Sequence, residues 1–281
     1  MKLAINQATL KSTPCEDFIC AAGDAKFDGV EVNQENIATY LTQGTYKTLK
    51  DTLESYQLAV ASVNALEDFN LCSDFDFKTK FLTQMQFMCE IGYKLESDLI
   101  VVTPSFLRED ADPAEVREDK IISKTQKRLS EVSKIAAKTD LTVGVEFFAF
   151  PYASVRSLNL ARKIIDPLVP KLENVGYVVD TFHFLVSGGN VTDLTGISNL
   201  FMIHMSDLSY TPGEDLSGKK DSDRVFPGEG NFDFQVFLSS LKNNRYRGYL
   251  SIELFDPELD KKVPLEVAKK ARESFNNLRL W

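Results

Sequence analysis

Eight short apolar runs alternate with longer segments of helical period along the chain, and this alternation restricts the fold more than any other feature. In each longer segment, apolar residues recur every three or four positions. Such repeated units predict a parallel sheet whose strands are joined by helices. Runs such as LIVV and VGYVV are apolar at consecutive positions, which is expected of strands covered on both faces.

The sequence predicts eight strands, each followed by a helix. The strands are expected at residues 2–6, 29–32, 58–66, 98–104, 143–148, 175–184, 201–207 and 249–255. The helices are expected at residues 17–25, 45–56, 77–95, 120–139, 154–166, 192–197, 234–244 and 265–277. Eight βα units with right-handed crossovers close most readily into a barrel, whose catalytic face lies at the carboxyl ends of the strands.

The chain is expected to form one domain over residues 1–281. Barrels of this kind with roughly 250 residues fold as a single unit, and no linker or low-complexity tract interrupts the series. The apolar stripe of the helix at 77–95 is interpreted as core. The polar segment 208–230 is too long for a plain turn, and loops of that length are usually functional or mobile. We therefore predict a single (β/α)8 TIM barrel.

Composition excludes some classes of function. The net charge of −9 disfavours a protein that binds nucleic acid, because such binding needs clustered Lys and Arg. The four cysteines show no paired spacing and predict free thiols in a reducing compartment. The N-terminal residues lack the apolar region of a signal peptide, and no run is long enough to span a membrane. We therefore expect a cytoplasmic protein with no nucleic-acid or membrane partner.

Four of the predicted strands each carry a side chain capable of binding a metal near the downstream end: Glu146, Asp180, His204 and Glu253. A single strand-end carboxylate is more often a cap or an ion-pair partner than a ligand. In a barrel, however, these four would converge, and burying them without a cation would cost several kcal/mol per charge. Three carboxylates and an imidazole suit one divalent ion such as Mn²⁺, Mg²⁺, Co²⁺ or Zn²⁺.

The chain has two histidines, and both fall in this region. A core histidine that bonds a carbonyl is the simplest interpretation of either one alone. With the strand-end set we interpret His204 as a ligand and His183 as a substrate or acid–base contact. A carboxylate or carbonyl should hold the second nitrogen of His204, and Asp207 is the nearest candidate in sequence.

Several strings point to a known family: MKL..N.AT at the start, NAL..FN at 64–70, VEF at 145–147, NVGYVVDTFHF, IHMSD, DRVFPGEG and SIELFDPE. With these strings, the chain resembles the xylose isomerase-like barrel superfamily, and within it most closely the inosose isomerases. The likeness runs almost end to end, and the last four strings are the most specific. It implies a TIM barrel enzyme of sugar or polyol metabolism, and the closer likeness implies a place in inositol catabolism.

The resemblance also implies roles for individual residues. It assigns the metal to Glu146, Asp180, His204 and Glu253, and substrate contacts to His183 and Arg224. Asn6 and Phe226, which lie in two of the shared strings, are further expected substrate contacts. The chain departs from the family pattern at four positions, which predict a less polar pocket wall: Phe150, Leu185, Phe226 and Glu229.

These expectations describe a metal-dependent isomerase or epimerase of a ketose or cyclic polyol ketone. Glu146 and Glu253 would transfer a proton through a metal-bound enediolate, as base and acid. A hydride shift would need a second metal, to which Asp207 or His183 could contribute.

Two alternatives stay open and a third does not fit the sequence. One is a dehydratase of a hydroxyketone, of the inosose or dehydroshikimate type, on the same barrel. Another is a sugar-binding barrel without catalysis. DNA repair of the endonuclease IV type needs a histidine-rich three-metal site, which two histidines cannot supply. The expected partner is a small polyol or sugar, and the oligomeric state, monomer or homodimer, is left open.

Overall fold

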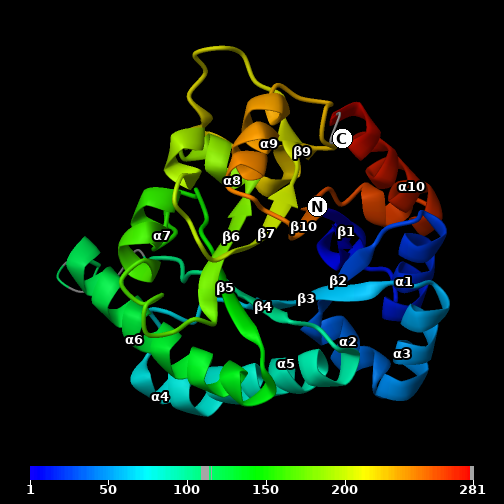
Figure 1. Cartoon of the computed structure of the whole chain (residues 1–281), viewed down its shortest axis with the longest axis horizontal. Coiled ribbons are helices and arrows are strands. Elements are labelled where there is room, and N and C mark those ends of the chain that lie inside the picture. Colours follow the sequence, from blue (N-terminus) through cyan, green and yellow to red (C-terminus); the bar gives the residue numbers. More distant parts are fainter. Residues whose placement is uncertain (109–113, 115, 279–281) are drawn as a thin grey trace.

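The structure is a computed structural model that describes residues 1–108, 114 and 116–278. In this part of the chain, eight parallel strands close into a barrel in the order β1-β10-β7-β6-β5-β4-β3-β2. Helices surround the strands (Figure 1). The predicted (β/α)8 TIM barrel is therefore confirmed.

The barrel strands are short and lie close to their predicted positions. They are β1 (Lys2–Asn6), β2 (Gly29–Asn33), β3 (Ala59–Leu66), β4 (Leu99–Val102), β5 (Thr142–Glu146), β6 (Val175–Asp180), β7 (Leu200–Met205) and β10 (Tyr249–Ile252). The helices are α1 (Cys15–Asp24), α2 (Gln34–Tyr40), α3 (Tyr46–Ser55), α4 (Asp74–Asp76), α5 (Leu82–Leu95), α6 (Glu118–Ala136), α7 (Leu158–Ile165), α8 (Thr181–Val186), α9 (Phe234–Asn243) and α10 (Pro264–Ser274).

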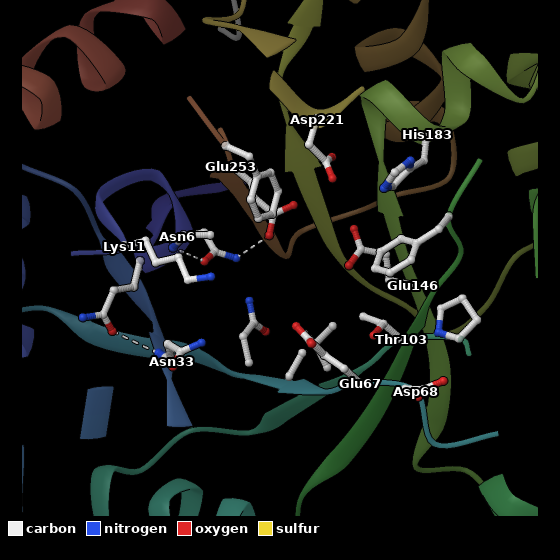
Figure 2. Close-up of a pocket in the computed structure, with 18 of the residues that line it drawn as sticks. Asn6, Lys11, Asn33, Glu67, Asp68, Thr103, Glu146, His183, Asp221 and Glu253 are labelled. Carbon is white, nitrogen blue, oxygen red and sulfur yellow. Dashed lines mark hydrogen bonds between the residues drawn. The ribbon is translucent and has the colours of Figure 1, made fainter. Parts of the chain in front are cut away.

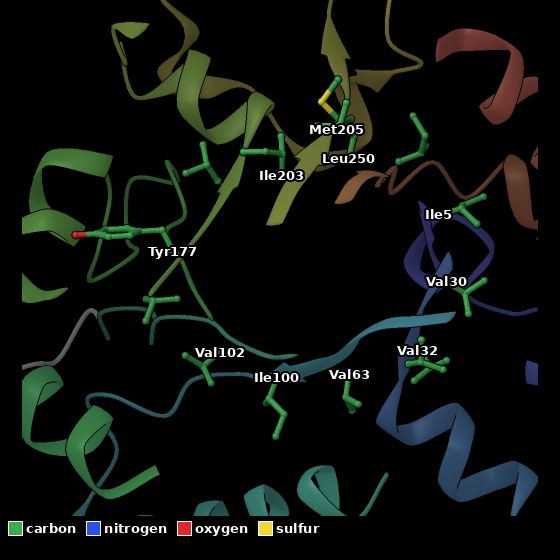
Figure 3. Packing of buried hydrophobic residues seen from close by; sticks show 14 of the residues in the cluster. Ile5, Val30, Val32, Val63, Ile100, Val102, Tyr177, Ile203, Met205 and Leu250 are labelled. Carbon is green, nitrogen blue, oxygen red and sulfur yellow. The ribbon is translucent and has the colours of Figure 1, made fainter. Parts of the chain in front are cut away.

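Alternate strand residues supply two separate cores. The larger core lies between the barrel and the helices, and Figure 3 shows part of it, including Ile5, Val30 and Ile203. A smaller cluster consists of the alternate strand residues Ala4, Leu99, Val101, Val178 and Met202 together with Ala61. Successive side chains of a strand point to opposite faces of the sheet. The smaller cluster therefore lies inside the barrel, and strand residues on the same face as its members also point inward.

Inward-facing residues change in character along β5. A Cβ at Gly144 would lie 2.6 Å from a methyl group of Val178, so only glycine fits at this level of the packed interior. Two residues later, Glu146 also points inward and is 3% exposed. The apolar interior therefore ends below the carboxyl ends of the strands, where polar side chains take its place.

The predicted helix at 77–95 is confirmed with one modification. A π-helical turn at Phe77–Phe81 precedes α5. The apolar stripe that was interpreted as core is buried throughout, at Phe77, Phe81, Met85, Met88 and Ile91.

The sixth helix was predicted at the wrong place. The structure has only a 3₁₀ turn at Val191–Leu194, and α8 follows β6 directly. The predicted strand at 175–184 therefore ends at Asp180, whose Oδ1 accepts a hydrogen bond of 2.8 Å from the backbone N–H of His183 and so caps α8. The strand-like composition of TFHF concealed this helix start.

The long segment after β7 contains regular structure that was not predicted. Two short antiparallel strands, β8 (Asp207–Leu208) and β9 (Arg224–Val225), pair at its base. Within the described ranges, no helix combines the length and the apolar composition needed to cross a membrane.

Candidate metal and substrate site

Strand register brings the four predicted ligands together at the carboxyl end of the barrel. In the parallel pairing of β6 with β7, Asp180 lies opposite His204. In the pairing of β10 with β7, Ser251 lies opposite His204, so that Glu253 follows two residues later on the same face. Glu146 ends β5 beside Val178.

The four side chains form a compact buried cluster. One potential ligand atom from each of Glu146, Asp180, His204 and Glu253 lies within 4.8 Å of the others. Nδ1 of His204 is 2.9 Å from Oε1 of Glu146 and 3.2 Å from Oε2 of Glu253. None of the four is more than 6% exposed.

Glu31, which the sequence analysis missed, holds the far side of His204. Its Oε2 is 3.1 Å from Nε2 of His204, and it also accepts hydrogen bonds from Ser62 and Asn64. Glu31 is fully buried on β2, next to a shift in the register between β2 and β3. Its signal in the sequence was a lone acid between valines in a buried strand.

Asp207, the neighbour in sequence, does not contact His204. Its carboxylate instead accepts hydrogen bonds from the backbone N–H groups of Leu208, Gly228, Gly230 and Phe232, at 2.8 to 3.0 Å. A Cβ on Gly230 would lie 2.5 Å from Oδ1 of Asp207, so the close approach requires glycine. The predicted carboxylate partner of His204 is therefore Glu31, and the PGEG part of the shared string anchors a loop.

Burial and mutual repulsion perturb the carboxylates. Burial raises the pKa of Glu146 to about 8; the charge of His204 opposes this rise, and the charge of Glu253 adds to it. Burial would lower the pKa of His204, but the carboxylates of Glu253, Glu31 and Glu146 outweigh it and raise this pKa well above its ordinary value. The imidazole therefore lies in a strongly negative environment.

His183 and Arg224 form a second buried pair beside the cluster. Nη2 of Arg224 is 3.1 Å from Nε2 of His183, and Nη1 donates to Oδ2 of Asp180 at 2.5 Å. The backbone N–H of Ala149 donates to Nδ1 of His183 at 3.3 Å, so the two ring nitrogens both have N–H groups beside them, and a neutral ring accepts from one of the two. Burial, followed by the charges of Arg224 and His204, lowers the pKa of His183 well below its ordinary value. These surroundings therefore favour the neutral form of His183.

A cavity of about 340 Å³ opens onto these groups. Figure 2 shows Glu146, Glu253, His183 and Asn6 around it. Nδ2 of Asn6 donates a 2.7 Å hydrogen bond to Oε1 of Glu253 and so fixes the orientation of that carboxylate. The expected substrate contacts Asn6, His183 and Arg224 all line the cavity.

Phe226 is not part of the cavity lining, so its expected substrate contact is corrected. The side chain is 4% exposed and packs in the outer core, with Nζ of Lys270 4.5 Å from the ring centroid. Leu185 and Glu229 also lie outside the lining, and Glu229 pairs with Lys270 at 2.8 Å. Of the four departures from the family pattern, only Phe150 lines the cavity.

The donor set fits a divalent cation. Four buried carboxylates lie in or beside the site, at Glu31, Glu146, Asp180 and Glu253, and the half-buried Asp221 is a fifth. The guanidinium of Arg224 pairs with three of the five, Asp180, Asp221 and, at 3.7 Å, Glu253. This excess of buried negative charge favours a bound cation. Oxygen atoms with one imidazole are donors suited to such an ion, and the carboxylate on the far nitrogen of His204 is a common support for a histidine ligand.

Comparison with known proteins agrees with this arrangement. The sequence model of the xylose isomerase-like TIM barrel family matches residues 19–280. The inosose isomerase of Halalkalibacterium halodurans is 30% identical, with 98% of this chain and 95% of that protein covered. That of Bacillus subtilis is 27% identical, with 98% and 96% covered. These full-length relatives confirm the prediction of an isomerase-class enzyme.

Two further comparisons bear on chemistry and fold. The crystal structure of IOLI protein with a bound zinc atom superimposes with a TM-score of 0.89 at 26% identity, covering 99% of this chain and 98% of that one. The 3-dehydroshikimate dehydratase of Pseudomonas aeruginosa is 28% identical over 91% of this chain, which spans only 38% of that protein.

Proposed function

Since the chain belongs to the xylose isomerase-like TIM barrel family, we propose that it is a divalent-metal-dependent isomerase or epimerase of a cyclic polyol ketone of the inosose type. The observation that carries the proposal is the buried cluster of Glu146, Asp180, His204 and Glu253 at the catalytic end of the barrel. The full-length inosose isomerase relatives support the substrate class.

The same four residues would hold the cation. Three carboxylates and Nδ1 of His204 offer the donors, and the zinc-bound neighbour supports Zn²⁺ as one candidate beside Mn²⁺, Co²⁺ and Mg²⁺. When bound, a divalent ion polarises the ketone oxygen of the substrate and makes the adjacent C–H more acidic.

Glu146 and Glu253 would move the proton. They come from β5 and from the end of β10, and both line the cavity. One carboxylate removes the proton from the carbon beside the ketone, and the electron pair of the C–H bond forms the double bond of an enediolate. Return of a proton to the neighbouring carbon gives isomerisation, and return to the opposite face of the same carbon gives epimerisation.

His183 and Arg224 would orient the substrate. The neutral imidazole can share a hydrogen bond with a hydroxyl group, and the guanidinium lies where it can stabilise negative charge on the enediolate oxygen. Asp180 fixes this guanidinium, so the ligand cluster and the substrate-orienting pair are linked through one ion pair.

The experiment is turnover of an inosose in D₂O with the metal-loaded protein. Solvent deuterium in the product supports proton transfer, and its absence from a product formed at full rate refutes it. Glu146→Gln and Glu253→Gln should keep the fold and lower kcat by at least about 100-fold, the usual contribution of a general acid or base. Full activity in either variant would refute the role of that glutamate.

A dehydratase is the second candidate, favoured by the similarity to dehydroshikimate dehydratases. In that reaction the enediolate would expel a β-hydroxyl group as water. A product 18 mass units lighter than the substrate identifies it, whereas an isomerase conserves mass. A binding barrel without catalysis would show neither product.

The cytoplasmic location of the protein, its single domain over residues 1–281 and its oligomeric state stay predictions.

A further inference from the structure

The cavity that contains Glu146 and Glu253 has two unlike walls. The charged side chains of Lys11, Glu67 and Asp68 are part of the cavity lining. Side-chain amides from the ends of β1, β2 and β3 and from α2 line one wall: Asn6, Asn33, Asn36 and Asn64. Three phenylalanines from the segments after β4 and β5 line the other: Phe106, Phe148 and Phe150. In Figure 2, Asn6 and Asn33 lie on the opposite side of the cavity from His183. The rings of Phe148 and Phe150 each lie 4.9 Å from the His183 ring.

The three phenylalanines form one continuous aromatic wall. Their ring centroids are 5.9 to 6.2 Å apart, within the range of favourable aromatic pairs. Phe106 is 49% exposed, and Phe148 and Phe150 are half-buried. A large apolar surface therefore lines the same cavity as the proposed acid–base groups.

The backbone that carries this wall is firmly held. The N–H of Leu107 donates to the carbonyl of Tyr152 at 2.6 Å, and the N–H of Ser154 donates to the carbonyl of Ser105 at 2.8 Å. Phe106 thus lies in a short antiparallel bridge to Ala153.

Asn70 connects this bridge to the segment after β3. Its side-chain oxygen accepts from the N–H of Ser105 at 2.6 Å, and its Nδ2 donates to Oγ of Ser154 at 3.1 Å. Asn70 is fully buried. The aromatic wall is therefore organised before any ligand binds, which lowers the entropic cost of binding.

We propose that the aromatic wall formed by Phe106, Phe148 and Phe150 is a subsite for an apolar substituent, alkyl or aryl, carried by the hydroxylated ring of the substrate, as in a glycoside or an ether of a keto-sugar. The inference rests on the proposed function, because it places the hydroxylated ring between the amide wall and the two glutamates. The subsite would select substrates by a substituent of the ring, in addition to the hydroxyl groups of that ring.

The polarity of the two walls supports this assignment. Hydroxyl groups that point at phenyl rings would lose hydrogen bonds to water, so this wall favours the least polar part of a substrate. An apolar substituent would instead bury its own surface and that of Phe106.

The alternative is that the C–H face of the hydroxylated ring itself stacks on the phenylalanines. The two cases differ in their response to the substituent. If the ring face stacks, removal of Phe106 weakens every ligand equally. If the wall receives a substituent, removal of Phe106 weakens only the ligand that carries one.

The experiment measures the Kd of two unreactive probes, methyl and phenyl β-D-glucopyranoside, by calorimetry with the full chain loaded with Mn²⁺. The probes share a hydroxylated ring and differ only in the substituent. We expect phenyl glucoside to bind the wild-type protein about tenfold more tightly, as one aromatic contact allows. Phe106→Ala should reduce this preference to less than about twofold. Phe75→Ala, which removes a phenyl group 74% exposed on α4, should leave it unchanged.

Three outcomes overturn the subsite: equal Kd values in the wild type, no measurable binding of either probe, or equal weakening of both probes by Phe106→Ala. Glu146→Gln separates this result from the proposed function. It should lose turnover of an inosose and keep the preference for the phenyl probe. A preference for the phenyl probe in a protein that never turns over an inosose would refute the proposed function and leave the subsite standing.

Discussion

His204 and His183 lie at the same end of the barrel in opposite electrostatic surroundings. Carboxylates approach both ring nitrogens of His204, whereas N–H donors approach those of His183 and phenyl rings pack on it. Their pKa values accordingly shift in opposite directions. The surroundings, and not the residue type, therefore separate a ring suited to hold a cation from a neutral ring suited to contact a substrate.

The largest effect that tests this comparison is expected from His204→Gln. Loss of the imidazole removes one donor and leaves three buried carboxylates, so the affinity for Mn²⁺ should fall by more than the factor of about 100 that supporting residues reach. Turnover should fall with it. Metal content after dialysis and the kcat with saturating Mn²⁺ measure the two effects. Retention of wild-type affinity would remove His204 from the ligand set.

His183→Gln should separate the two histidines. The variant loses the ring beside Arg224 but no proposed ligand, so metal content should stay at the wild-type level. The kcat should fall by about 100-fold, the lower range for a group that assists proton transfer or stabilises charge. A parallel loss of metal would mean that the two sites are not distinct.

Glu31→Gln tests the contribution of the carboxylate that faces Nε2 of His204. The amide keeps the shape of the side chain, but it removes the negative charge behind Nε2 of His204. We expect a 10- to 100-fold lower affinity for Mn²⁺, as for other partners of ligating histidines. Titration with Mn²⁺ followed by thermal unfolding measures it, since a ligand of the native state must stabilise that state. An unchanged affinity would limit Glu31 to a packing role.

The smallest effect concerns acid stability of the metal-free protein. Unfolded His183 binds a proton as the pH falls below about 6.5, whereas folded His183, with its lowered pKa, does not. Between about pH 6.5 and 5.5, this difference should lower the free energy of unfolding by about 1 kcal/mol, because unfolded His183 is already half protonated at the upper value.

The two histidines should give opposite signs in this measurement. His183→Gln should lose the acid-sensitive component, which urea unfolding in EDTA at the two pH values would show. His204, whose folded pKa is raised, stabilises the fold below about pH 6.5 and loses this contribution as the pH rises through its folded value. His204→Gln should therefore become more acid-sensitive than the wild type. An unchanged pH dependence in His183→Gln would contradict a neutral ring.

The sequence predicted the barrel and the position of the cluster because both follow from period and strand order. Glu146, Asp180, His204 and Glu253 stand at strand ends, and parallel strands bring such ends together whatever the connecting loops do. The sixth helix was misplaced because Asp180 both ends a strand and caps the helix that follows, and the pattern of apolar residues does not distinguish these roles.

Contacts between distant strands were harder to predict. Glu31 and His204 are 173 residues apart, and nothing local shows which acid will face the second nitrogen of the ring. The family pattern placed Phe226 in the pocket, but the β8–β9 pairing and Lys270 hold it in the outer core. Asp207 was close in sequence to His204, yet the backbone of its own loop satisfies its carboxylate.

The hydrogen bonds that Asp207 accepts at the base of its loop have a consequence for evolution and engineering. The carboxylate of Asp207 accepts from backbone N–H groups on both sides of the loop, at Leu208 and at Gly228 to Phe232. Residues 210–219 can therefore lengthen or be exchanged without displacing Arg224, which β9 holds in place. Doubling the length of such a closed loop costs only about 0.6 kcal/mol. This segment is therefore an interchangeable module at the catalytic end of the barrel, through which relatives could diversify and designers could graft new sequences while the ligand cluster stays constant.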